Sequence, residues 1–210
     1  MNKTSKKQLI SSQLNAMFPD AKCELSYSSP YQLLVAVILS AQCTDKRVNM
    51  VTKELFKSYG TPEKMLTLSQ SQLEEKIHSC GFYHNKAAAI LSMSKDIITK
   101  FNGVVPNDFD DLCSLAGVGR KTANVIISEA FKGDGFAVDT HVLRIANRLQ
   151  LVSEKNPNKV EMQLKSYFDQ SDWSRLHYQM VLFGRYKCKA QNPDCKDCPF
   201  EKICKKEYKK

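Results

Sequence analysis

Four cysteines in a short segment near the C-terminus constrain this chain more than any other feature of its sequence. They follow the pattern C-x6-C-x2-C-x5-C in a chain of 210 residues, and they are Cys188, Cys195, Cys198 and Cys204. Thiolates this close in sequence can converge on a single metal centre. The pattern therefore predicts a loop that folds around an inorganic group.

The other four cysteines are scattered, which argues against a disulfide framework. No apolar run approaches the roughly 18 residues of a membrane span, and no signal-peptide core follows the basic N-terminus. We therefore expect a cytoplasmic protein with no membrane partner, in a compartment that keeps thiols reduced. In that setting each scattered cysteine is expected to be a small buried hydrophobe; they are Cys23, Cys43, Cys80 and Cys113.

The charge balance makes the chain basic. It has 31 Lys and Arg against 22 Asp and Glu, a formal net charge of +9 and a pI of about 9.1. Such a balance favours a polyanionic partner such as nucleic acid. A merely basic surface would give the same numbers, so charge alone leaves both interpretations open.

Helical periodicity recurs along the chain with few strand signals, and it predicts an all-α fold. The segment 30–41 is apolar almost all round, which is typical of a buried helix. Glycines that follow helical segments suit left-handed C-caps, and the break at 133–136 is the expected boundary between two parts. Further helices are expected at 45–59, 70–79, 84–101, 108–115, 120–131, 140–149, 157–169 and 172–187.

A glycine hairpin lies between two of these helices, in the sequence LAGVGRKTANVI. Gly117 and Gly119 flank Val118 and allow a tight turn that approaches a partner closely. Backbone N–H groups at the turn and at the next helix start lack intrahelical acceptors, which makes a site for a phosphate-sized anion. Such a site, extended by Arg120 and Thr122, would hold a DNA backbone without reading its sequence.

Lys121 and Asp139 are the candidate catalytic pair. Lys121 lies in the first turn of the helix after the hairpin, and a lysine that attacks carbon must be neutral when it does so. The alternative is a solvated lysine that pairs with phosphate. Asp139 precedes a helix start, where a carboxylate is a good N-cap; near an amine it would also stabilise positive charge or assist deprotonation.

These motifs resemble one known family. The segments L-A-G-V-G-R-K-T-A-N and V-D-T-H, together with the cysteine pattern, look like bacterial endonuclease III, of the helix-hairpin-helix-GPD superfamily of DNA glycosylases. The similarity extends from Pro30 to Cys204. The chain departs from the family at Ala116, where relatives usually have proline, and at Phe183, where some have histidine.

The resemblance implies a bifunctional enzyme of base excision repair. Such an enzyme removes oxidised pyrimidines from double-stranded DNA, after the damaged nucleotide has been flipped out of the stack. By motif, Lys121 would attack C1′ and form a Schiff base, and Asp139 would be the catalytic carboxylate. A β-elimination would then cleave the strand at the abasic site. The expected protein is a monomer associated with the nucleoid.

Three further residues match DNA-contacting positions of the family. Gln42 would enter the gap left by the flipped nucleotide, although without the family it is an ordinary polar residue at a helix end. Phe82 matches a wedge into the opposite strand, although it would equally serve as a core aromatic. His141 would lie near the lesion pocket.

By the same resemblance, the four C-terminal cysteines would bind a [4Fe–4S] cluster. Structural zinc is the chemical rival, because four cysteines also bind zinc. Zinc sites usually show two close pairs of cysteines, whereas only Cys195 and Cys198 are paired here. Basic residues around the ligands are expected to touch DNA phosphate; they are Arg185, Lys187 and Lys189.

The family fold would divide the chain into two lobes. A six-helix domain over 22–133 would carry the hairpin at about 108–131, and residues 1–21 would join 134–210 in the iron–sulfur domain. Two other functions remain as alternatives. An adenine or mismatch glycosylase of the superfamily is disfavoured by the lysine itself, and a non-catalytic iron–sulfur module would not need the pair of Lys121 and Asp139.

Overall fold

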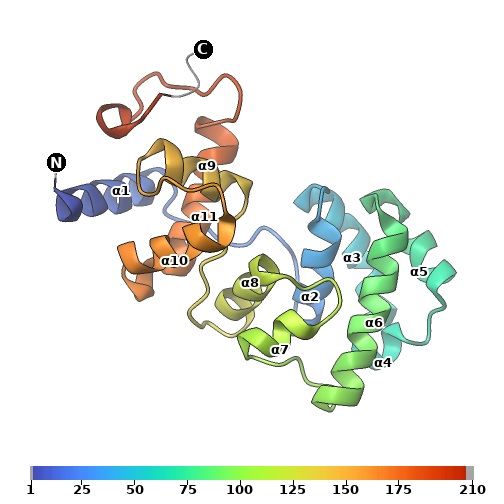
Figure 1. Ribbon diagram of the computed structural model, residues 1–210. Helices are drawn as coiled ribbons and strands as arrows, with labels where there is room; N and C mark the ends of the chain where they lie inside the picture. The colour runs from blue at the N-terminus through green and yellow to red at the C-terminus, as the bar shows by residue number, and fades with distance from the viewer. Residues whose placement is uncertain (1, 207–210) are drawn as a thin grey trace. The chain divides into compact units, whose positions relative to one another are not determined.

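A computed structural model describes residues 2–206, and these residues form helices and loops without any strand (Figure 1). The all-α class predicted from the sequence is confirmed. None of the helices formed by these residues combines the length and apolar character needed to cross a bilayer. The α-helices are α1 Lys3–Met17, α2 Pro30–Ser40, α3 Asp45–Tyr59, α4 Pro62–Met65, α5 Gln70–Ile77, α6 Tyr83–Phe101, α7 Phe109–Ser114, α8 Arg120–Ala130, α9 Thr140–Arg148, α10 Pro157–Tyr167 and α11 Trp173–Leu182.

The chain folds as two compact units. One is the continuous segment Glu24–Gly133, and the other joins Met1–Cys23 to Asp134–Lys210. Short 3-10 turns add η1 (His78–Cys80) to the first unit, and η2 (Gln170–Asp172) and η4 (Glu201–Ile203) to the second. The chain therefore leaves the second unit after α1 and returns to it before α9.

The first unit is built around α2. Ser29 caps this helix by accepting the backbone N–H of Gln32, and Pro30 occupies its first turn, where a missing N–H costs nothing. Every residue from Leu33 to Leu39 is buried. Helices α3, α6 and α8 pack against α2. A helix that is apolar all round thus forms the centre, and amphipathic helices cover it.

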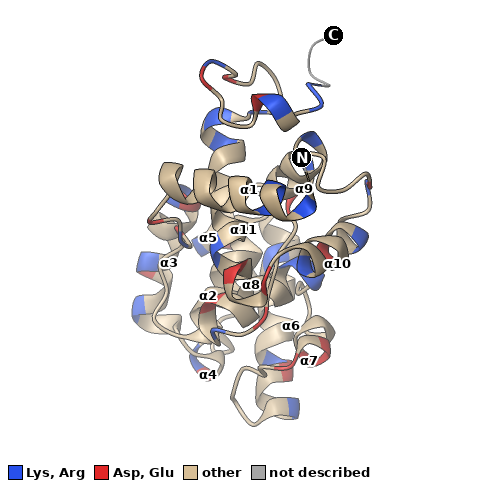
Figure 2. Cartoon of the chain, turned by 90° about the vertical axis from the view of Figure 1, so that its left-hand side faces the viewer, with Lys and Arg blue, Asp and Glu red and all other residues tan. Residues whose placement is uncertain are grey.

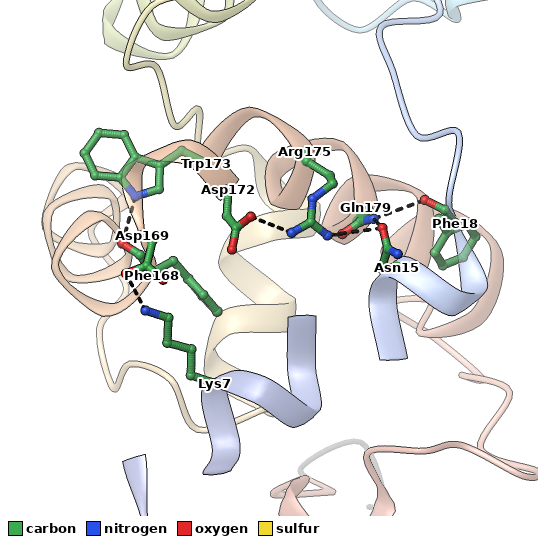
Figure 3. A network of polar contacts seen from close by, with 9 residues as sticks. All are labelled: Lys7, Asn15, Phe18, Phe168, Asp169, Asp172, Trp173, Arg175 and Gln179. Carbon is green, nitrogen blue, oxygen red and sulfur yellow. Dashed lines mark hydrogen bonds and ion pairs between the residues drawn. The ribbon is translucent and has the colours of Figure 1, made fainter. Parts of the chain in front are cut away.

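The second unit owes its core to both ends of the chain. On α1, Ile10 and Leu14 are fully buried in one cluster with residues of α9, α10 and α11. Polar contacts hold the rim of this packing (Figure 3): Lys7 pairs with Asp169 at 2.7 Å, and Asn15 Oδ1 accepts from Arg175 and Gln179. The helix near the N-terminus is therefore part of this unit rather than an appendage.

Three local expectations were wrong. The helix predicted over 172–187 ends at Leu182 and continues as a π-helical turn, η3 (Phe183–Lys187). A Cβ on Gly184 would lie 2.9 Å from His141 Cβ, so close packing on α9 displaces the regular helix there. Gly60 ends α3 with φ −83° rather than in the left-handed region. Of the scattered cysteines only Cys80 is buried, because the others lie in loops or on half-exposed helix faces.

Candidate functional site

The hairpin between α7 and α8 is fixed by its backbone and by one buried side chain. Gly117 has φ +78°, and a Cβ there would lie 3.0 Å from Ala89 Cβ, so both conformation and space require glycine. Val118 is buried and donates its N–H to Leu115 O at 3.1 Å. Gly119 is exposed and extended, with open space around it. The turn therefore presents its backbone outward at Gly119.

The start of α8 has the features of an anion site. Gly119 is the N-cap residue and supplies no side chain to the first N–H groups of this 11-residue helix. Arg120 lies with its guanidinium 4.6 Å from the Phe109 ring centroid, which holds a cation beside those groups. Thr122 is half-buried in the same turn. N–H groups without a side-chain cap, the positive end of the helix and a fixed cation together favour a phosphate group.

Lys121 projects from this first turn with an exposed side chain. The next residues of α8, from Ala123 to Ile126, are buried. The helix is thus anchored by its apolar face while its first turn remains accessible. An amine on such a rigid element can reach an external electrophile without rearrangement of the backbone.

Asp139 caps α9 in the other unit. Its Oδ1 accepts the N–H of Val142 at 2.8 Å, and the carboxylate is only partly buried. Because the carboxylate is partly exposed, its second oxygen, Oδ2, can still accept a hydrogen bond from another partner. The position expected from the sequence, at the helix N-cap, is confirmed. Lys121 and Asp139 belong to different units, and their joint action stays a prediction.

His141 lies two residues further along, against η3. Its Nδ1 is 3.1 Å from Arg144 Nη2, and the same guanidinium donates to Gly184 O at 2.8 Å. Burial lowers the pKa of His141, and the nearby Arg144 and Arg185 lower it further, whereas Asp139 acts in the opposite direction. This imidazole is therefore biased toward its neutral form.

Gln42 and Phe82 share an unusual conformation. Gln42 has φ 54° and Phe82 has φ 48°, in the left-handed region that residues other than glycine seldom occupy. Phe82 is 63% exposed, which excludes the alternative of a core aromatic. Gln42 is exposed in the loop after α2. Strained, exposed residues of this kind are typical of functional sites.

The four C-terminal cysteines line one pocket, whose walls also include the apolar side chains of Leu149, Phe183 and Phe200. Among the described residues, no three His, Cys, Asp or Glu side chains meet closely enough to hold a metal ion as placed. The thiols thus share a cavity without converging on one point. Burial raises the pKa values of the Cys188 and Cys198 thiols. A metal would therefore have to displace their protons on binding.

Two arginines of α9 hold the start of the cysteine loop, and the sequence analysis missed both. Arg148 is buried and donates to Cys188 Sγ at 3.2 Å, and to the carbonyls of Lys189 at 2.7 Å and Ala190 at 2.9 Å. Arg144 donates to Cys188 O at 3.2 Å. A possible signal was their spacing of four residues, which places both on one face of a strongly amphipathic helix.

The basic residues near the cysteines are not equivalent. Figure 2 shows Lys and Arg interleaved with acidic residues in the last part of the chain. Lys187 pairs with Asp194 at 3.2 Å and also donates to Lys196 O. Lys189 is exposed, and Arg185 is partly buried on η3. Of the predicted phosphate contacts, Lys187 therefore has an internal structural role as well.

Comparison with known proteins agrees with this combination of helices, hairpin and cysteines. Residues 35–170 match the HhH-GPD superfamily of base excision DNA repair proteins, which defines the class of the chain. Endonuclease III of Bacillus subtilis is 47% identical over 199 residues, which are 94% of this chain and 91% of the relative. The chain belongs to the endonuclease III family, and the resemblance predicted from the sequence is confirmed.

Solved structures support the same assignment. A non-covalent endonuclease III–DNA complex matches with a TM-score of 0.93 and 45% identity, over 98% of this chain and 96% of that one. A trapped covalent intermediate of endonuclease III with DNA gives the same values.

Proposed function

We propose that this chain is a bifunctional DNA glycosylase that excises oxidised pyrimidines from duplex DNA and then cleaves the abasic site by β-elimination. The observation that carries the proposal is the exposed Lys121 amine at the first turn of α8, beside an uncapped helix N-terminus suited to phosphate. A covalent endonuclease III–DNA intermediate has been trapped for a protein 45% identical to this chain. Formation of such a bond requires a nucleophile, and Lys121 has the geometry for one.

The proposed reaction begins with binding and unstacking. The hairpin from Gly117 to Gly119, together with Arg120 and Thr122, binds phosphate without reading sequence. Gln42 then enters the gap left when the damaged nucleotide leaves the stack, and Phe82 acts as a wedge into the opposite strand. Their exposure and their fixed left-handed backbone support these roles.

Lys121 supplies the covalent step. Its neutral Nζ attacks C1′, and the glycosidic bond breaks as the base departs with the bonding electrons and gains a proton. The attached nitrogen then loses one proton, and the C1′–O4′ bond breaks with a proton passing to O4′, which opens the sugar ring and leaves a protonated Schiff base that keeps one hydrogen on nitrogen. Loss of a proton from C2′ then expels the 3′ phosphate, and hydrolysis of the imine returns the lysine.

Asp139 is proposed to act on the charge that develops in this reaction. Its carboxylate is held by the N–H of Val142 and remains partly exposed. An ionised carboxylate would stabilise positive charge on the sugar as the base leaves, and it would help to remove a proton from the lysine. His141 is proposed to line the lesion pocket as a neutral imidazole.

The four cysteines are proposed to hold a [4Fe–4S] cluster. The donor set fits the cluster: all four thiols line one pocket with apolar walls, and Arg148 and the backbone N–H of Lys206 donate to two of the sulfurs. Zinc sites usually have two close pairs of cysteines, whereas only Cys195 and Cys198 form such a pair here, which favours the cluster over a single zinc ion. When bound, the cluster would cross-link the loop and so order Lys189 and Arg185 for phosphate contact.

Borohydride trapping tests the proposal. The protein is mixed with a duplex that contains one oxidised pyrimidine, and reduction converts any Schiff base into a covalent adduct visible on a gel. We expect an adduct from the wild type and from Lys132→Gln, and a loss of about 10⁴-fold in adduct formation for Lys121→Gln. Lys132 is an exposed lysine just beyond the same helix. A wild-type protein that binds the duplex but gives no adduct would exclude the lyase mechanism.

A further inference from the structure

A buried cation joins the two loops that carry Gln42 and Phe82. Lys86 lies in the first turns of α6 and is only 5% exposed. Its Nζ donates to Leu39 O at 2.8 Å and to Cys80 O at 2.9 Å. These contacts are carbonyl oxygens, so the side chain acts on backbone geometry rather than on a carboxylate.

The two carbonyls lie at the ends of helices. Leu39 belongs to the last turn of α2, and Cys80 is the last residue of η1. Carbonyls at such ends lack intrahelical donors and carry the negative end of the helix dipole. One ammonium with three N–H donors is therefore well suited to cap both at once. The backbone N–H of Lys86 also donates to Phe82 O at 3.1 Å.

Each capped helix leads directly into one of the strained residues. Gln42 follows Leu39 by three positions, and Phe82 follows Cys80 by two. A left-handed backbone at a residue other than glycine persists only where the surroundings enforce it. Lys86 contacts the chain just before both residues, so it fixes the relative position of the two loops.

Burying the Lys86 ammonium at this position costs free energy, because the charge loses its contact with water. Burial lowers the pKa of Lys86, against the smaller opposing effect of the neighbouring Cys80 and Cys43 thiols. An apolar side chain would fill the same space without desolvating a charge. A cation at such a position is better explained by the geometry that it imposes than by net stability.

We propose that Lys86 is a positioning residue that holds the loops of Gln42 and Phe82 at a fixed separation, so that both side chains enter the DNA together. The inference rests on the proposed function, because it requires that these loops insert into a duplex. It assigns a role in nucleotide flipping to a residue that does not itself touch the substrate.

The test compares a lesion that must be unstacked with one that is already unstacked. Single-turnover excision is measured for Lys86→Met on an oxidised pyrimidine in a fully paired duplex, and on the same lesion placed in a single-nucleotide bulge. Unpaired bases cost less to extrude. We therefore expect a loss of about tenfold or more on the paired duplex and of less than about threefold on the bulge. Lys95→Met is the matched control, because Lys95 lies exposed on the same helix.

The outcomes separate a positioning role from a structural one. Equal losses on both substrates, or no loss on either, would overturn the proposal. A wild-type protein that excises neither lesion and gives no borohydride adduct would instead overturn the proposed function. Thermal unfolding by circular dichroism checks that the variant is folded at the assay temperature. If Lys86→Met is unfolded, Lys86→Gln, which keeps an N–H donor but no charge, is judged by the same ratio of rates.

Discussion

The hairpin between α7 and α8 and the cysteine loop at 188–204 are both short connecting segments, yet they hold their shapes by different means. The hairpin uses glycine at its left-handed position and buries Val118. The cysteine loop instead places Asn192 and Asp197 in the left-handed region, and arginine side chains hold its carbonyls. The hairpin is thus determined by local backbone chemistry, whereas the loop depends on groups supplied from elsewhere.

Removing one cysteine ligand should give the largest effect on stability. With the proposed cluster bound, we expect the wild-type protein to be brown and to contain iron, and Cys198→Ser to lack both and to have a free energy of unfolding lower by more than about 4 kcal/mol, as follows from loss of a metal site. Iron analysis and thermal unfolding measure both. The matched change Cys113→Ser, on α7 in the other unit, should retain iron. A stable Cys198→Ser protein with full iron content would contradict the cluster assignment.

The hairpin should instead respond to a single added methyl group. Gly117→Ala places a Cβ 3.0 Å from Ala89 Cβ at a φ of +78°. We expect this substitution to lower the free energy of unfolding by about 2 kcal/mol. Gly119→Ala, with open space and an extended backbone, should cost less than about 0.5 kcal/mol. Chemical denaturation measures both variants. If both alanine substitutions lowered the free energy of unfolding equally, the close packing of Gly117 would not be what fixes the turn.

A smaller effect than that of Gly117→Ala is expected from pH at His141, which packs against Gly184 of η3. Burial lowers the pKa of this side chain below its usual value of 6.5, so the unfolded chain binds the proton more tightly than the folded one. The stability that comes from keeping His141 neutral is therefore fully present above pH 6.5, and it is lost as the pH falls from 6.5 through the lower pKa of the folded state. Between about pH 7.5 and pH 5.5 we expect wild-type stability to fall by up to about 1 kcal/mol more than that of His141→Gln. Parallel pH profiles would contradict this.

Local chemistry explains what could be predicted of the fold. Helix starts were predictable where a capping residue precedes an apolar pattern, as at Asp139. The helices expected at 45–59 and 108–115 begin in the same way, because Thr44 and Asp108 accept backbone N–H groups of α3 and α7. The four-residue helix α4 was not expected, because it is too short to show a period. The π-helical turn depends on packing against α9, and no pattern within the segment reveals such a contact.

The residues of the candidate site also fall into those that local sequence motifs reveal and those that only long-range contacts reveal. Lys121 and the cysteines were identifiable because their motifs are contiguous, and their chemical roles remain proposals. Lys86 and Arg148 were missed, since charged residues on amphipathic helices are usually solvated. Their burial depends on partners far away in sequence, 47 residues for Lys86 and Leu39, and 40 for Arg148 and Cys188. Only the folded chain brings these groups together.

The place of α1 in the second unit has a consequence for synthesis on the ribosome. Asn15 and Gln179, which contact each other in the folded protein, are 164 residues apart. The unit Glu24–Gly133 is contiguous, so it can fold as soon as it has emerged. Helix α1 is made before it, but its apolar residues Ile10 and Leu14 have no core to enter until the later helices appear. Although α1 is synthesised before the unit Glu24–Gly133, it is thus among the last helices to be buried, and it must stay exposed and unaggregated until then.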